Sequence, residues 1–142
     1  MASVFDVAAF ILKKKKAITA MKLQKLVYYA QAWSLVWDEK PLFKERIEAW
    51  ANGPVCPALY AEHRGEFTVT EEPKGDAGNL KKAERETVEA VLRDYGDKSA
   101  IWLSELTHKE DPWRDARANV PDGQRSSSVI THAAMAEYYS GL

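Results

Sequence analysis

Cysteine, long apolar runs and net charge are all scarce in this chain. Cys56 is the only cysteine among 142 residues, so no disulfide can form within the chain and a cysteine-rich metal site is excluded. A lone thiol suits a reducing compartment. No apolar run approaches the roughly 20 residues that a membrane helix needs, and the first residues lack the charged and then apolar layout of a signal peptide. We therefore expect a cytoplasmic protein.

The net charge of −1 gives no bulk attraction to nucleic acid or to acidic membranes. The charge is unevenly distributed, however. Residues 1–37 hold six lysines against one aspartate and carry +5, whereas the other 14 basic and 20 acidic residues give −6. The basic end is either a docking feature or a solvated collar of lysines at a helix C-terminus, where cations are favoured.

The composition is that of a globular protein. Hydrophobic residues make up 46% of the chain and charged residues 29%, which disfavours intrinsic disorder. Five Trp, six Tyr and four Phe are enough to fill one sizeable core. The length fits one ordinary domain, and no internal repeat is present, so we expect residues 1–142 to form a single domain.

Helical periodicity is clearest at the N-terminal end. Ser3 followed by Asp6 resembles a capping box and predicts a helix over about residues 4–15. Thr19 is the N-cap candidate of a second helix, over about residues 20–37. Its apolar residues cover so wide a surface that the helix must pack on more than one side, which makes it the expected centre of the fold.

One face of the central helix is more polar than the rest. Lys22, Lys25 and Tyr29 form this remaining face, and we expect their side chains to be exposed. Between this helix and the next, Asn52-Gly53-Pro54 is a strong breaker, since glycine permits positive φ and proline fixes its own φ.

The rest of the chain predicts shorter elements. Ile101, Trp102, Leu103 and Leu106 are the expected apolar set of one helix, and Ile130, Ala133, Ala134 and Tyr138 that of a last helix capped within Ser126 to Ser128. The expected elements are strands within 47–51 and 66–70, a loop over 71–79, and helices at 57–63, 81–95, from 98, at 113–118 and after 128. The predicted fold class is mainly α (α+β): a compact single helical domain around a central apolar helix, with a small two- or three-stranded β insertion.

Catalytic and metal-binding motifs are missing. Cys56 and His63 lie seven residues apart with no motif of a catalytic cysteine around them, so a structural cysteine is the preferred interpretation. His108, Glu110 and Asp111 lack the spacing that places two metal ligands on one helical face. No phosphate-binding loop, nucleophile elbow or kinase signature is present. We therefore expect no enzyme, no catalytic residue, no metal and no cofactor.

Recognition of another macromolecule is the remaining class. The two helices that flank Ala17 carry lysines, but the second is too apolar to lie in a DNA groove, so direct nucleic-acid binding is not expected. Aromatic residues in or next to turns fill the core or anchor an interface, and both alternatives stay open for Trp50, Tyr60, Trp102 and Trp113.

Several segments resemble a known family. The most specific are KLQKLVYYAQ at 22–31 and AWANGPV at 49–55, supported by Tyr60, by 103–108 and by Pro112-Trp113. Together they resemble the Panacea domain, the antitoxin family that includes SocA-like, phage-associated proteins. The resemblance runs from the first helix to about residue 118.

The resemblance implies a type II-like antitoxin that neutralises a cognate toxin, encoded by a neighbouring gene, through direct protein–protein binding. An alternative is a proteolytic adaptor that hands a bound toxin to a ClpXP-type protease. Either function needs a toxin-binding face. We expect it to include Lys22, Lys25 and Tyr29 of the central helix and the turn residues Trp50, Asn52, Gly53, Pro54 and Tyr60. The alternative for the turn is that Gly53 and Pro54 shape a tight connection while Trp50 fills the core.

Overall fold

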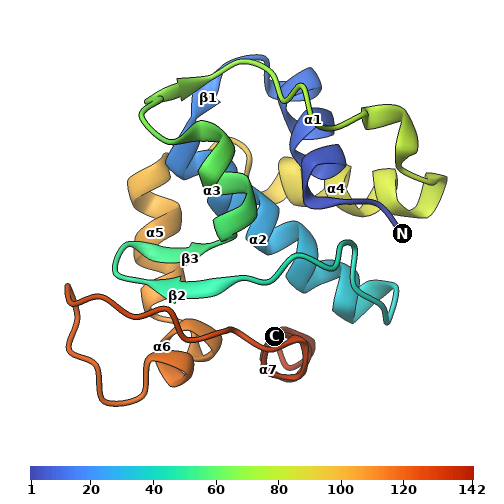
Figure 1. Cartoon of the computed structure of the whole chain (residues 1–142). Helices are drawn as coiled ribbons and strands as arrows, with labels where there is room; N and C mark the ends of the chain where they lie inside the picture. Colours follow the sequence, from blue (N-terminus) through green and yellow to red (C-terminus); the bar gives the residue numbers. More distant parts are fainter.

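The helix α2 (Ala20–Trp37) runs through the middle of the computed structural model, which describes residues 1–142 (Figure 1). It contacts α1, α3, α4, α5 and α7, so its wide apolar surface is covered on several sides. The seven α-helices are α1 (Val4–Lys15), α2, α3 (Pro57–His63), α4 (Lys82–Tyr95), α5 (Ala100–His108), α6 (Asp111–Arg117) and α7 (His132–Ser140), with a 3-10 turn, η1, at Ala77–Asn79. The predicted mainly helical fold around this helix is confirmed.

The caps expected from the sequence start the first two helices. Ser3 and Asp6 form a reciprocal capping box on α1, and the Thr19 side chain accepts a hydrogen bond from the Lys22 backbone N–H. Thirty buried residues from all parts of the chain form one hydrophobic cluster around α2. None of the helices combines the length and the apolar composition that a membrane span requires.

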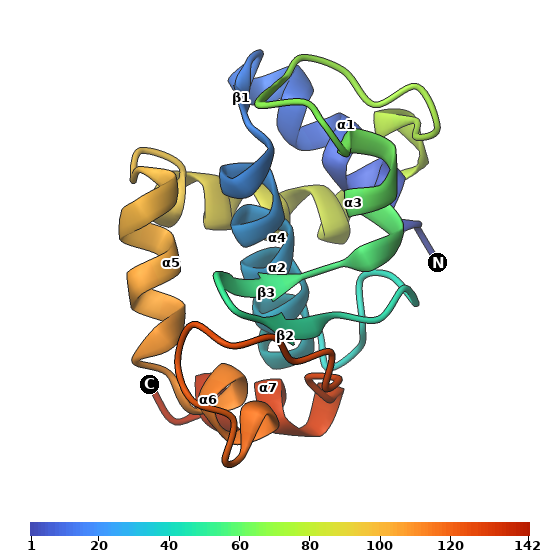
Figure 2. The same ribbon diagram turned by 60° about the vertical axis from the view of Figure 1, so that its left-hand side comes forward.

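Two small antiparallel sheets complete the fold. β1 (Ile18–Thr19) pairs with β4 (Thr68–Val69), and β2 (Glu48–Trp50) forms a hairpin with β3 (Gly53–Val55) in which Trp50 lies opposite Gly53. The chain near residue 129 then runs antiparallel to β2, with a bridge between Glu48 and Val129. Figure 2 shows this returning segment passing β2 on the side away from β3.

The last helix differs from its prediction. Its N-cap is Thr131, because the segment that contains the expected serine caps is hydrogen-bonded to β2: the Ser128 carbonyl accepts from Ala49 N–H. Consequently Met135 and Tyr139 are the buried residues of α7. The expected set was wrong for Ala133, which is exposed, and for Ala134 and Tyr138, which are half-buried, while Ile130 is buried ahead of the helix.

Two other expectations need correction. The predicted strand at 66–70 is reduced to the two residues of β4, since its only partner is the equally short β1. In α5 the expected apolar residues Ile101 and Trp102 are exposed, because the helix packs against α2 and β3 through the face that carries Leu103 and Thr107.

Candidate functional site

Two glutamines of α2 form hydrogen bonds with backbone groups of neighbouring segments that lie outside the strands. The Gln24 side chain accepts a hydrogen bond from Cys56 N–H at 2.8 Å and donates to the Cys56 carbonyl at 3.3 Å. About two turns further along the helix, Gln31 accepts from Leu42 N–H and Phe43 N–H and donates to the Phe43 carbonyl. An amide side chain offers both a donor and an acceptor, so each glutamine satisfies buried backbone groups that would otherwise be unpaired.

The β2–β3 hairpin is fixed from both sides. On the α2 side, Lys25 Nζ donates to the Pro54 carbonyl at 3.0 Å. On the opposite side, Trp113 Nε1 donates to the Trp50 carbonyl at 2.8 Å, and the Arg117 guanidinium donates to the Ala49 carbonyl at 3.0 Å. The hairpin is therefore a rigid support for the side chains that it carries.

Gly53 makes room for the lysine. Its φ of +123° lies in the region that L side chains rarely adopt, and a Cβ at this position would come within 2.6 Å of Lys25 Cε. Glycine is thus required at this position both by the backbone conformation and by the close approach of the Lys25 side chain.

A groove of about 890 Å³ opens beside this support. It is lined by the first turns of α2, by the β2–β3 hairpin, by α3 and by residues 125–127. We call it the Trp50 groove, and its lining includes Met21, Lys25, Trp50, Asn52, Tyr60 and Arg125. Three stretches that are far apart in sequence, within 20–25, 48–64 and 125–127, therefore share one concave surface.

An aromatic pair dominates one wall of the Trp50 groove. The rings of Trp50 and Tyr60 meet edge to face with centroids 4.9 Å apart. Trp50 is half-buried, and Tyr60 is 38% exposed. Trp50 Nε1 donates to Glu48 Oε1 at 2.8 Å, while the other oxygen of that carboxylate accepts from Arg46 at 2.7 Å. Both rings are thus held in place with part of their surface open to a partner.

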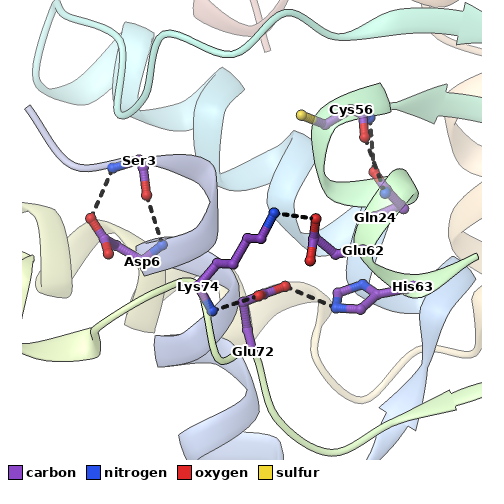
Figure 3. A network of polar contacts seen from close by, with 8 residues as sticks. All are labelled: Ser3, Asp6, Gln24, Cys56, Glu62, His63, Glu72 and Lys74. Atoms are coloured by element: carbon purple, nitrogen blue, oxygen red, sulfur yellow. Dashed lines mark hydrogen bonds and ion pairs between the residues drawn. The ribbon is translucent and has the colours of Figure 1, made fainter.

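The ionisable residues in the rest of the groove lining are mostly basic. Arg64, Arg125 and His63 join Lys25 in the lining, against the single carboxylate of Glu48, whose two oxygens are already engaged. His63 Nε2 lies 2.9 Å from Glu72 Oε1, and both side chains are buried (Figure 3). Figure 3 also shows Lys74 bridging back to Glu62 of α3, so the loop after β4 closes over this end of α3.

Comparison with known proteins assigns the chain to a family. The sequence model described as "Antitoxin SocA-like, Panacea domain" matches residues 23–114, from α2 into α6. The chain belongs to this family. The Panacea domain is also 31% identical, over 132 residues, to Antitoxin SocA of Caulobacter vibrioides (strain NA1000 / CB15N), in an alignment that covers 81% of this chain and 70% of that protein. No solved structure gives a significant match.

Six of the eight predicted site residues of the Panacea domain lie in or directly behind the Trp50 groove. Lys25, Trp50, Asn52 and Tyr60 lie together in the Trp50 groove, and Gly53 and Pro54 are buried in β3 behind it. Lys22 is half-buried on α2 outside the groove lining. The breaker at 52–54 is a hairpin in which Gly53 and Pro54 belong to the second strand.

The expectation that Lys25 and Tyr29 are exposed was wrong. Lys25 is 1% and Tyr29 0% exposed. Lys25 is covered by β3, and Tyr29 lies against segments that follow much later in the chain: its ring stacks on Tyr95 at 4.2 Å, and its hydroxyl donates to Glu110 at 2.6 Å. A helical pattern alone does not show that a polar face will be covered by such distant segments.

Sequence reasoning missed the contributions of Arg64, Arg125 and Met21 to the groove. Arg125 comes from an irregular segment after α6, and no periodicity connects it with α2. The one available signal was Gln24, a polar residue beside the apolar positions of a central helix, which marks the point where α2 binds the hairpin.

The residues that were considered as catalytic or metal-binding candidates are buried or in contact with neighbouring side chains. Burial raises the pKa of the Cys56 thiol, which disfavours the nucleophilic thiolate, and His63 is occupied by Glu72. His108 stacks on Trp113 with ring centroids 4.0 Å apart. No group of three or more His, Cys, Asp or Glu side chains is arranged to hold a metal ion.

Proposed function

We propose that this Panacea domain neutralises a cognate toxin by binding it directly through the Trp50 groove. The observation that carries the proposal is the aromatic pair of Trp50 and Tyr60, fixed on a rigid hairpin and partly exposed in a concave surface. Membership of the antitoxin family supplies the partner, a cognate toxin. The proposal includes no catalytic step.

Physical reasons support this surface as the binding face. Interface energy is concentrated in a few aromatic and arginine side chains near the centre of a contact, surrounded by residues that exclude water. The Trp50 groove offers two aromatic rings, with Arg64 and Arg125 beside them. Because Gln24, Lys25, Trp113 and Arg117 already hold the backbone around the groove, little ordering is needed on binding.

The test is co-expression with the neighbouring reading frame, followed by a growth assay and a pull-down. We expect growth to be rescued and a stable complex to be recovered. Tyr60→Ala should abolish the rescue, because it removes an exposed anchor without opening the core. Trp102→Ala is the matched control, since Trp102 is 44% exposed on α5, outside the groove lining.

Three outcomes have different meanings. Equal loss in Tyr60→Ala and Trp102→Ala, with both variants folded, would refute the Trp50 groove as the binding face. Disappearance of the neighbour's protein, reversed when the ClpXP-type protease is deleted, would replace neutralisation by occlusion with the adaptor mechanism. Absence of both toxicity and complex would contradict the proposal as a whole.

A further inference from the structure

Lys25 is a buried cation with no counter-charge. Its side chain is 1% exposed, and its only hydrogen-bond partner is the Pro54 carbonyl. No ion pair of the structure includes Lys25, and burial alone lowers the pKa of this ammonium group to about 7. An ammonium group has three donors, so two N–H groups of Lys25 have no acceptor within the chain.

Most other buried charged side chains have a charged partner or several hydrogen bonds, although Arg117 Nε, His63 Nε2 and Glu72 Oε1 make no hydrogen bond. Asp6 and Glu84 accept bonds at helix N-termini, Glu48 binds Arg46 and Trp50, and His63 pairs with Glu72. The most useful comparison is Arg117, another buried cation without a carboxylate, which donates to three backbone carbonyls and lies over the Trp113 ring. Buried charges are normally paired because an uncompensated one is strongly destabilising. Lys25 departs from that rule, with one acceptor and no counter-charge, and it lines the Trp50 groove.

We propose that Lys25 receives a carboxylate from an acidic segment of the toxin, which enters the Trp50 groove. This inference rests on the proposed function and adds the chemistry of the partner. Charge complementarity selects an acidic segment: Lys25, Arg64 and Arg125 line the groove, and its one carboxylate, Glu48, is held by Arg46 and by Trp50 Nε1. The carboxylate completes the donors of Lys25, while Trp50 and Tyr60 contact the flanking apolar atoms of the segment.

Lys25→Met is the decisive variant, because methionine keeps an unbranched side chain and removes the charge. We expect the affinity for the co-expressed toxin to fall about 30-fold, as for truncation of one partner of a buried charge pair. Lys22→Met is the matched control on the same helix and should leave the affinity unchanged. Neutralising the toxin's Asp and Glu residues one at a time should reveal one position whose effect vanishes in the Lys25→Met background.

Proton uptake by the wild-type protein is a second readout. A carboxylate that reaches Lys25 restores its charge, so calorimetry of toxin binding at pH 8 in buffers of different ionisation enthalpy should detect a proton taken up. The other titratable groups that face this region are Glu48 and His63 in the groove, and His108 of α5 behind β3. Uptake that persists in Lys25→Met would assign the proton to one of them and overturn the inference.

The outcomes separate the inference from the proposed function. A wild-type complex that forms without proton uptake, or that folded Lys25→Met binds with equal affinity, overturns the carboxylate site but leaves direct neutralisation intact. A complex that survives neutralisation of every surface carboxylate of the toxin does the same. If the wild-type protein binds no toxin at all, the proposed function fails, and this inference fails with it.

Discussion

Lys25 of α2 and Glu110 are two buried ionisable groups that differ in their hydrogen-bond partners. Glu110 Oε1 accepts hydrogen bonds from Tyr29 at 2.6 Å and from Tyr139 at 2.7 Å, and the Tyr28 and Tyr139 hydroxyls lie 3.0 Å apart. Burial raises the pKa of Glu110, and the two hydroxyl donors partly offset this effect. Lys25, one helical turn before Tyr29, has a single carbonyl partner.

The difference separates a closed polar network from an open one. The network around Glu110 joins α2, α6 and α7 and satisfies its own members, so its expected role is to hold these helices together. The region around Lys25 leaves donors unused beside a groove, so its expected role is to bind. Substitutions in the first should reduce stability, and substitutions in the second should reduce binding.

Glu110→Ala should have the largest effect. It leaves the Tyr29 and Tyr139 hydroxyls without their acceptor in a buried site and creates a cavity, so we expect the free energy of unfolding to fall by about 3 kcal/mol. Urea denaturation monitored by tryptophan fluorescence measures the change. Glu110→Gln keeps an acceptor oxygen and should lose less than half as much. Equal losses in both variants would show that the carboxylate itself, and not an acceptor at this place, is required.

Gly53→Ala should have the next largest effect and tests how closely Lys25 is packed. The φ of +123° and the 2.6 Å approach to Lys25 Cε together should lower the free energy of unfolding by about 2 kcal/mol. Gly65→Ala is the matched control, because Gly65 also has a positive φ, of +85°, but nothing lies within 4 Å of its added Cβ. Equal denaturation midpoints for the two variants would mean that the lysine yields to the methyl group at no cost.

The pH dependence of stability should reveal the uncompensated charge. The pKa of Lys25 falls from its usual 10.5 to about 7 on folding, so between these values the unfolded chain holds a proton that the folded chain has released. The free energy of unfolding therefore rises with pH in this window, at up to about 1.4 kcal/mol per pH unit. Denaturation at pH 7, 8 and 9 should show this slope in the wild type and not in Lys25→Met. Identical slopes would mean that Lys25 stays charged in the fold.

The positions of α2 and of the turn after β2 could be predicted from the sequence, but the burial of individual α2 side chains could not. Thr19, the helical spacing over 20–37 and the breaker at 52–54 predicted α2 and the connection beside it, because caps, periodicity and turn residues act over a few positions. The burial of Lys25 and Tyr29 depends on Pro54 and Glu110, which lie 29 and 81 positions away. No local pattern carries that information, and both residues were therefore predicted to be exposed.

For the same reason, only part of the groove lining could be predicted from the sequence. Trp50 and Tyr60 were predicted as candidates because aromatic residues near turns are either core or interface, and the structure shows them half-buried and partly exposed, between these two alternatives. Arg125 could not be predicted, since its place depends on the segment before α7 pairing with β2 through residues 128–130.

Tyr29→Phe should have the smallest effect on stability. Compared with Lys25→Met, it tests whether the two regions have separate roles. It removes one of two donors to Glu110 while keeping the ring that stacks on Tyr95, so we expect a loss of about 1 kcal/mol in the free energy of unfolding and no change in toxin affinity. Lys25→Met should show the reverse, with stability at pH 7 unchanged or increased and affinity reduced, because an apolar side chain replaces an unpaired buried charge. Denaturation and calorimetry on the same two proteins measure both quantities. A fall in toxin affinity for folded Tyr29→Phe would contradict the separation, since it would mean that the closed network controls the shape of the Trp50 groove from one helical turn away.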